Sequence, residues 1–133
     1  MSKKRIHFSM AGVEKKSFSL PFNGGMIWCE HLDSLGEDET SFRAKLSADC
    51  NELSKPSAPS YLAFVLDETE VNVSCCEMIV DALTRRAHPK KVSFVGTSLG
   101  EKRQINSCLG KSDTNFATCF HDDLEAAKHW LIP

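Results

Sequence analysis

The sequence predicts a single α/β domain with a mixed, mostly parallel sheet, an N-terminal antiparallel hairpin and about four flanking helices. Three observations predict it. Short apolar runs typical of buried strands alternate with longer segments of helical periodicity. An Asn-Gly-Gly turn at residues 23–25 joins two strand-like runs near the start of the chain. Helix-capping signatures recur where helices are expected to begin.

The chain has 133 residues, a length that fits one domain. Residues 1–16 are polar and basic, and we expect them to form a loosely ordered segment before a domain over residues 17–133. Residues 17–32 read as the hairpin. Pro21 lacks a backbone donor, which places the first strand of that hairpin at a sheet edge.

The remaining elements are expected to alternate along the chain. The predicted helices cover residues 38–53, 75–87, 99–109 and 122–131, and the predicted strands cover residues 61–66, 92–95 and 116–120. Ser74, Ser98 and Asp122 each precede a glutamate by three residues, the spacing of a capping box. Gly110 is expected to close the third helix. In the first helix the apolar stripe consists of Phe42, Leu46, Cys50 and Leu53.

Composition narrows the classes of partner. With 16 basic and 18 acidic residues the net charge is −2, which gives no strong positive field, so no nucleic-acid partner is expected. No apolar run approaches the roughly 20 residues of a membrane span, and no apolar signal core follows the basic start. We therefore expect a cytoplasmic protein with no membrane span and no cofactor. Its six cysteines should be reduced and mostly buried.

One segment is a candidate anion-binding site. Gly96, Thr97 and Ser98 follow a predicted strand and open a predicted helix, and helix N-termini attract anions. Neither the dinucleotide glycine fingerprint nor the phosphate-binding loop with its lysine is present. A strand-to-helix turn with Ser98 as the cap is the favoured interpretation, and a weak anion or nucleotide site is the alternative.

Candidate catalytic groups are few. Cys75 and Cys76 lie at a predicted helix start, which would lower the pKa of Cys75, but no histidine lies nearby in the sequence to act as a base. A thiol-dependent enzyme that uses Cys75 or Cys76 is therefore a secondary hypothesis, and slow alkylation of both thiols would argue against it.

Asp67 ends a buried strand, and open α/β sheets bind ligands at such strand ends.

A metal site is the weakest of these hypotheses. Cys29 and His31 would share one face of a strand, and so would Cys119 and His121. Four zinc-competent side chains would meet if those two strands were neighbours. The spacing fits no established zinc pattern, so we expect no bound metal.

Four stretches together carry a family resemblance. They are Phe-Val-Leu-Asp at residues 64–67, Ser-Cys-Cys-Glu at 74–77, Lys-Val-Ser-Phe-Val-Gly at 91–96, and Cys-Phe-His-Asp-Asp-Leu-Glu-Ala-Ala-Lys-His-Trp-Leu at 119–131. This order resembles the STAS domain, and the tail resembles the ending of its SpoIIAA-like branch, the anti-sigma-factor antagonists. The resemblance covers about residues 17–131.

The resemblance implies a non-catalytic module that binds a protein partner, such as a kinase-like anti-sigma factor. The switch serine of the family falls on Ser74, or one residue later on Cys75. Its Asp-Ser-Ser-Gly pattern is replaced here by Val-Ser-Cys-Cys-Glu at residues 73–77. We expect residues 67–74 and the following helix to form the partner-binding face, with Asp67, Glu70, Ser74 and Cys75 as its regulatory residues.

An alternative function is a small-ligand or lipid-binding domain. Lipid-carrying domains of similar architecture hold their cargo between sheet and helices, which motivates this hypothesis. Native mass spectrometry would distinguish the two, because a co-purifying small molecule favours the ligand-binding domain.

Overall fold

The computed structural model describes residues 15–133, and these contain one five-stranded sheet. The strands are β1 (Phe18–Phe22), β2 (Gly25–His31), β3 (Tyr61–Val65), β4 (Lys91–Val95) and β5 (Ala117–His121). They lie across the sheet in chain order, with β1 antiparallel to β2 and every later pair parallel. The predicted mixed, mostly parallel sheet with an antiparallel hairpin is therefore confirmed, and Pro21 lies on an edge strand as expected.

The hairpin turn follows from two residues in the left-handed region. Asn23 has φ 47° and Gly24 has φ 81°, the backbone twist that suits a tight turn between antiparallel strands.

Of the polar segment predicted over residues 1–16, residues 1–14 lie outside the described residues. Lys15 is described, and its Nζ forms an ion pair with Asp33 at 2.9 Å.

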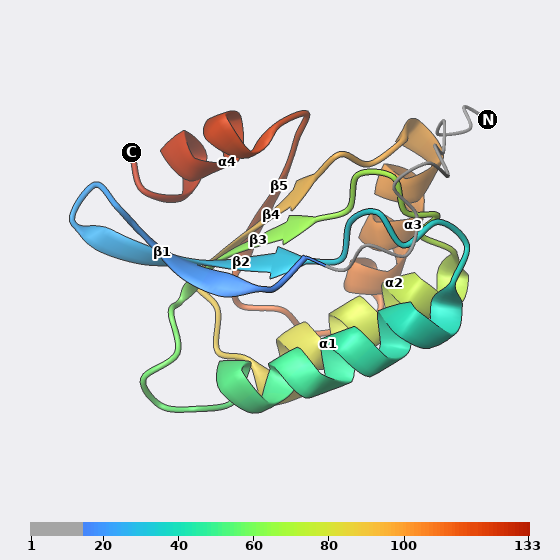
Figure 1. The fold of residues 1–133 in the computed structure, drawn as a ribbon, viewed down its shortest axis with the longest axis horizontal. Helices are drawn as coiled ribbons and strands as arrows, with labels where there is room; N and C mark the ends of the chain where they lie inside the picture. Colours follow the sequence, from blue (N-terminus) through green and yellow to red (C-terminus); the bar gives the residue numbers. More distant parts are fainter. Residues whose placement is uncertain (1–14) are drawn as a thin grey trace.

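The helices form two unequal layers around the sheet. They are α1 (Glu39–Leu53), α2 (Val73–Asp81) with the π-type turn η1 (Ala82–Arg86), α3 (Leu99–Gly110) and α4 (Leu124–Leu131). Figure 1 shows α1, α2 and α3 on one side of the sheet and α4 on the other. Because the strand order follows the chain order, successive crossovers of one hand bring their helices to the same face.

Strand alternation divides the core between these layers. Even-numbered strand residues such as Trp28, Phe64 and Phe94 pack in the larger core with the helices α1, α2 and α3. Odd-numbered residues such as Ile27 and Ala63 form a smaller core with Leu131 of α4. The four apolar residues predicted for the stripe of α1 are all buried.

Only one of the three predicted capping boxes is present. Ser98 and Glu101 cap each other at the start of α3, as predicted. The prediction for Ser74 is wrong, because the Asn72 side chain accepts from Cys75 N and α2 begins at Val73. At α4 the cap is shifted by one residue to Asp123, whose side chain accepts from Ala126 N. Asp122 and Asp123 are adjacent, and Asn72 lies two residues before Ser74, so local spacing alone does not select the capping residue.

Three boundaries also differ from the prediction. The helix expected over residues 75–87 widens into η1, where Ala87 N–H donates to Ala82 O, five residues back. Gly110 is the last residue of α3 and does not follow it, since Lys111 is the cap in right-handed conformation. The last strand is displaced by one residue, because His121 O accepts from Gly96 N and extends the pairing with β4.

Candidate functional site

The carboxyl ends of β3 and β4 bring two predicted groups together. Asp67 follows β3 and Gly96 follows β4, and a Cβ placed on Gly96 would lie 2.3 Å from the Asp67 carboxylate oxygen Oδ1. Gly96 has φ 78°, a left-handed conformation that favours glycine. The Asp67 carboxylate therefore packs against the bare Cα of Gly96, a contact that no side chain at residue 96 would permit.

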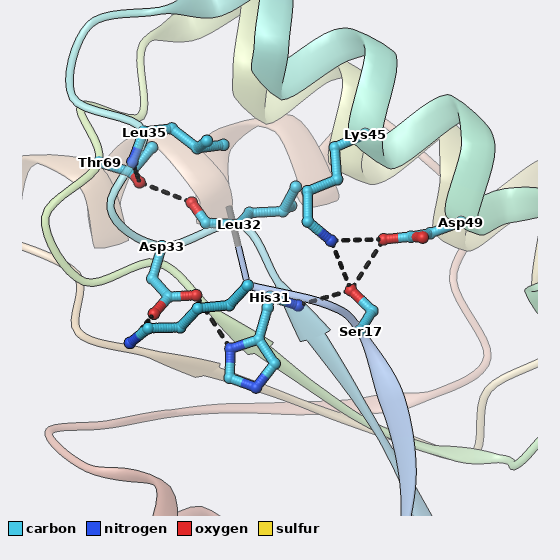
Figure 2. A network of polar contacts seen from close by, with 9 residues as sticks. Ser17, His31, Leu32, Asp33, Leu35, Lys45, Asp49 and Thr69 are labelled. Carbon is cyan, nitrogen blue, oxygen red and sulfur yellow. Dashed lines mark hydrogen bonds and ion pairs between the residues drawn. The ribbon is translucent and has the colours of Figure 1, made fainter. Parts of the chain in front are cut away.

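A buried threonine that the sequence did not single out fixes the segment after Asp67. Thr69 Oγ1 donates to Leu32 O at 2.6 Å and accepts from Leu35 N at 3.1 Å (Figure 2). Glu70 N donates to Gly36 O at 2.8 Å. Residues 67–72 are thus bound to the segment after β2, an arrangement without a recognisable sequence signal.

The candidate anion-binding turn at the start of α3 is already occupied by a carboxylate of the chain. Glu101 Oε1 accepts from Ser98 N at 2.9 Å, and Oε2 accepts from Val71 N at 2.8 Å. Gly96 N donates to His121 O. The Thr97 hydroxyl is buried and has no hydrogen-bond partner among residues 15–133. Glu101 therefore takes the position at this helix start that an external anion would need.

The predicted regulatory residues separate into exposed and buried ones. Glu70 is exposed, and Ser74 is half-buried in the first turn of α2, with its hydroxyl donating to Glu39 Oε2 at 3.3 Å. Cys75 is buried, and its burial is the main reason why its pKa is raised. Burial, with Cys108 and other neighbours, raises the pKa of Cys76 to about 12. Both thiols are therefore protonated, and neither has the thiolate form that attacks a substrate.

The two Cys-x-His pairs do not meet. Cys29 and His31 lie on β2, whereas Cys119 and His121 lie on β5, and both β3 and β4 separate these strands. Within residues 15–133 no three side chains of metal-binding type gather. The condition on which the zinc hypothesis depended, neighbouring strands, is not met.

A histidine–aspartate pair lies at the end of β2. His31 Nδ1 and Asp33 Oδ1 are 2.9 Å apart (Figure 2). Lys15 Nζ contacts the second oxygen of the same carboxylate. Burial opposes ionisation of Asp33, but the hydrogen bonds from His31 and Lys15 outweigh it and hold the pKa of Asp33 below its usual value. Phe18 stacks on the His31 ring. The carboxylate is fully engaged by these two partners.

A second polar cluster joins β1, β2 and α1. Ser17 Oγ donates to Asp49 Oδ2 at 2.8 Å and accepts from His31 N at 2.9 Å, and Lys45 Nζ contacts both Ser17 and Asp49 (Figure 2). Glu30 is completely buried beside this cluster, and burial together with the hydrogen-bonded Asp49 raises the pKa of Glu30 to about 9. The sequence signal for this residue is one acidic side chain near the end of a largely apolar strand.

Exposed apolar side chains mark the starts of α2 and α3. Val73 is 51% exposed and Leu99 is 50% exposed, and each is the first residue of its helix. The hydrogen bond from Val71 N to Glu101 Oε2 joins the two helix starts. Val71 lies two residues before Val73, and Glu101 lies two residues after Leu99. Two apolar side chains therefore lie open to solvent at neighbouring helix ends.

Comparison of the chain with protein-family models, with curated proteins and with solved structures finds no match. The STAS-like resemblance therefore remains a prediction from the sequence. No helix within residues 15–133 has the length and apolar character to cross a membrane.

Proposed function

We propose that the chain is a STAS-like, non-catalytic regulatory module that binds a protein partner through one surface. This surface, the α2 face, consists of residues 67–74, the exposed side of α2 and Leu99 at the start of α3. The observation that carries the proposal is the exposure of Val73 and Leu99 at two helix ends that are joined by the Val71–Glu101 hydrogen bond. Apolar side chains held open on rigid elements are what a protein partner can bury.

The charge of the α2 face favours a basic partner. Residues 67–81 contain five acidic side chains and no lysine or arginine: Asp67, Glu68, Glu70, Glu77 and Asp81. Asp81 pairs with Arg85, and Glu39 of α1, which accepts hydrogen bonds from Asn72 and Ser74, pairs with Arg43, so the acidic character comes mainly from Asp67, Glu68, Glu70 and Glu77. A partner with basic side chains around an apolar centre complements the surface in both respects. The resemblance suggests a kinase-like anti-sigma factor as the class of partner.

The state of the cysteines supports a binding role over a thiol-dependent one. Cys75 and Cys76 are buried with raised pKa values, so the groups at the start of α2 that face solvent are Glu70, Asn72, Val73 and, in part, Ser74. These groups suit recognition and supply no activated nucleophile.

Ser74 could regulate docking through its contact with Glu39. A phosphate on this residue would benefit from the positive end of the α2 dipole, but it would face the Glu39 carboxylate that the hydroxyl now contacts. Repulsion between the phosphate and Glu39 would open the contact between α1 and α2. The phosphate would also add negative charge to the α2 face. Modification of Ser74 would thus change both the shape and the charge presented to a partner.

The test is capture of partners by the intact chain and by a V73S/L99S double variant, with identification of the bound proteins by mass spectrometry. The double variant should lose a specific protein that the unmodified chain retains, and added salt should weaken the retained complex because the surface is acidic. The matched control is Met26→Ser, which removes a comparably exposed apolar side chain (43%) on β2.

Identical sets of bound proteins for the intact chain, V73S/L99S and M26S would contradict the proposal. A small molecule released from the purified chain in native mass spectrometry, with no captured protein, would favour the ligand-binding alternative instead. For the switch, Ser74→Asp should weaken capture and Ser74→Ala should preserve it. If both variants bind like the intact chain, Ser74 has no regulatory role.

A further inference from the structure

The carboxyl group of Glu30 lies in surroundings that do not stabilise a negative charge. Glu30 is the last residue but one of β2 and is fully buried. Its Oε1 accepts a hydrogen bond from Trp28 Nε1 at 2.8 Å, whereas no group of the described chain donates to its Oε2. The neighbouring group that, after burial, does most to raise the pKa of Glu30 is the half-buried carboxyl group of Asp49 on α1. A buried carboxyl group beside a second one favours its protonated form, since two neighbouring carboxylates repel each other.

We infer that Glu30 carries a proton at neutral pH and donates it to Asp49, forming a pH-sensitive latch between β2 and α1. This assignment explains the lone oxygen, because Oε2 then acts as a donor and needs no donor of its own. This assignment also places the proton on the carboxyl group whose charged form is the less stabilised of the two. Asp49 already accepts from Ser17 and Lys45, which favours its charged form, while within residues 15–133 the donor to Glu30 is the neutral Trp28 indole.

The charges around the pair balance only when Glu30 is neutral. The titratable groups of α1 near Glu30 are Lys45, Asp49 and the Cys50 thiol. Burial raises the pKa of Cys50 to about 11, so this thiol is uncharged at neutral pH. Lys45 and Asp49 form an ion pair at 3.1 Å. Ionisation of Glu30 would leave two carboxylates to share one ammonium group in a buried space, which is unfavourable.

The latch holds the junction of three elements. Ser17 Oγ, immediately before β1, bonds to Asp49 and Lys45 of α1 and to the backbone of His31 in β2 (Figure 2). Repulsion between Glu30 and Asp49 would therefore act where α1, β1 and β2 meet. Loss of one proton weakens the attachment of α1 to this edge of the sheet.

The sign of the pH effect follows from linkage. The pKa of Glu30 is raised from 4.5 to about 9 in the folded protein, so the folded state binds more protons than the unfolded state between these values. The contribution of Glu30 to stability is therefore complete only below its unfolded pKa of 4.5, and it falls as the pH rises from there toward the folded pKa of about 9. The lowered pKa of Asp49 acts only in stronger acid, below its ordinary value of 3.8.

The experiment measures the unfolding equilibrium of the full chain by denaturant titration between about pH 5.5 and 8, for the intact chain and for Glu30→Gln. Relative to the variant, the unfolding constant of the intact chain should rise about tenfold per pH unit, the effect of one linked proton. Glu52→Gln is the matched control. It is on α1 too, but its side chain is 55% exposed and pairs with Lys55, so its pH profile should follow that of the intact chain.

Parallel pH profiles for the intact chain and Glu30→Gln would overturn the inference. A direct measurement covers the case in which the variant does not fold: ¹³C NMR of the glutamate carboxyl carbons in the unmodified protein. One glutamate should keep its proton at neutral pH and titrate only in mild alkali. If every glutamate carboxyl is ionised at neutral pH, the latch does not exist.

Discussion

At the scale of the residue, Gly96 shows how one missing Cβ shapes the carboxyl end of the sheet. Its left-handed backbone turns the chain from β4 toward α3, and the space above its Cα is filled by the Asp67 carboxylate. A side chain at this position would be strained by the left-handed backbone and would also clash with the Asp67 carboxylate. Gly96 and Asp67 therefore depend on each other, although sequence patterns predicted a separate role for each.

Gly96→Ala should destabilise the fold by about 1–3 kcal/mol, measured by chemical denaturation, because of the strained backbone and the contact with Asp67. Gly110→Ala is the matched control. A Cβ there meets nothing within 4 Å, and alanine favours the helical conformation of α3, so the variant should be unchanged or up to about 1 kcal/mol more stable. Equal losses in the two variants would show that the Asp67 contact is unimportant.

At the scale of the element, the start of α3 is a junction as well as a cap. Glu101 closes the capping box with Ser98 and also accepts from Val71 N, which lies just before α2. One carboxylate thus fixes the relative position of two helix starts and of the apolar residues that begin them. Any partner that docks on the α2 face depends on this geometry.

Glu101→Gln should destabilise the fold by about 1–3 kcal/mol, because an amide NH₂ would replace one of the two acceptor oxygens and face a backbone donor. Hydrogen exchange of the Val71 amide should also become faster. Glu125→Gln makes the same change in the first turn of α4, where the side chain is 72% exposed, and should cost less than about 0.5 kcal/mol. If Val71 exchange is unaffected by Glu101→Gln, that hydrogen bond does not hold the junction.

At the scale of the whole molecule, the two faces of the sheet are covered very unequally. Three crossover helices bury one face, and the other has α4 as its helix within the described chain (Figure 1). Leu131 of α4 is buried against Ile27, Cys29 and Ala63. The smaller core therefore depends on the docking of one short helix.

Leu131→Ala should lower the free energy of unfolding by about 2–5 kcal/mol, since it removes a buried side chain from a small cluster that cannot easily collapse. Met26→Ala removes an exposed apolar side chain from β2, and should stay within about 0.5 kcal/mol of the intact chain. Denaturant titration compares the two variants. Similar losses for both would mean that α4 contributes little to the fold.

By itself, the sequence determined the α/β class, the hairpin and its edge position, and the buried stripe of α1. These features depend on local periodicity, on the Asn-Gly turn and on Pro21, all of which act over a few residues. One capping box was correctly placed. The other two predictions failed because Asn72, two residues before Ser74, and Asp123, next to Asp122, cap these helices instead. Such short polar side chains are all suitable caps, so local spacing does not select among them.

Only the tertiary structure decided how distant residues combine into sites. It separated Cys29 and His31 from Cys119 and His121 by two strands, and it buried Cys75 where a helix start alone predicted reactivity. It also brought Glu30 against Asp49, nineteen positions later in the chain, through the packing of α1 on β2. The physical reason is that burial and electrostatic contact depend on strand order and helix docking, which short-range sequence patterns do not encode.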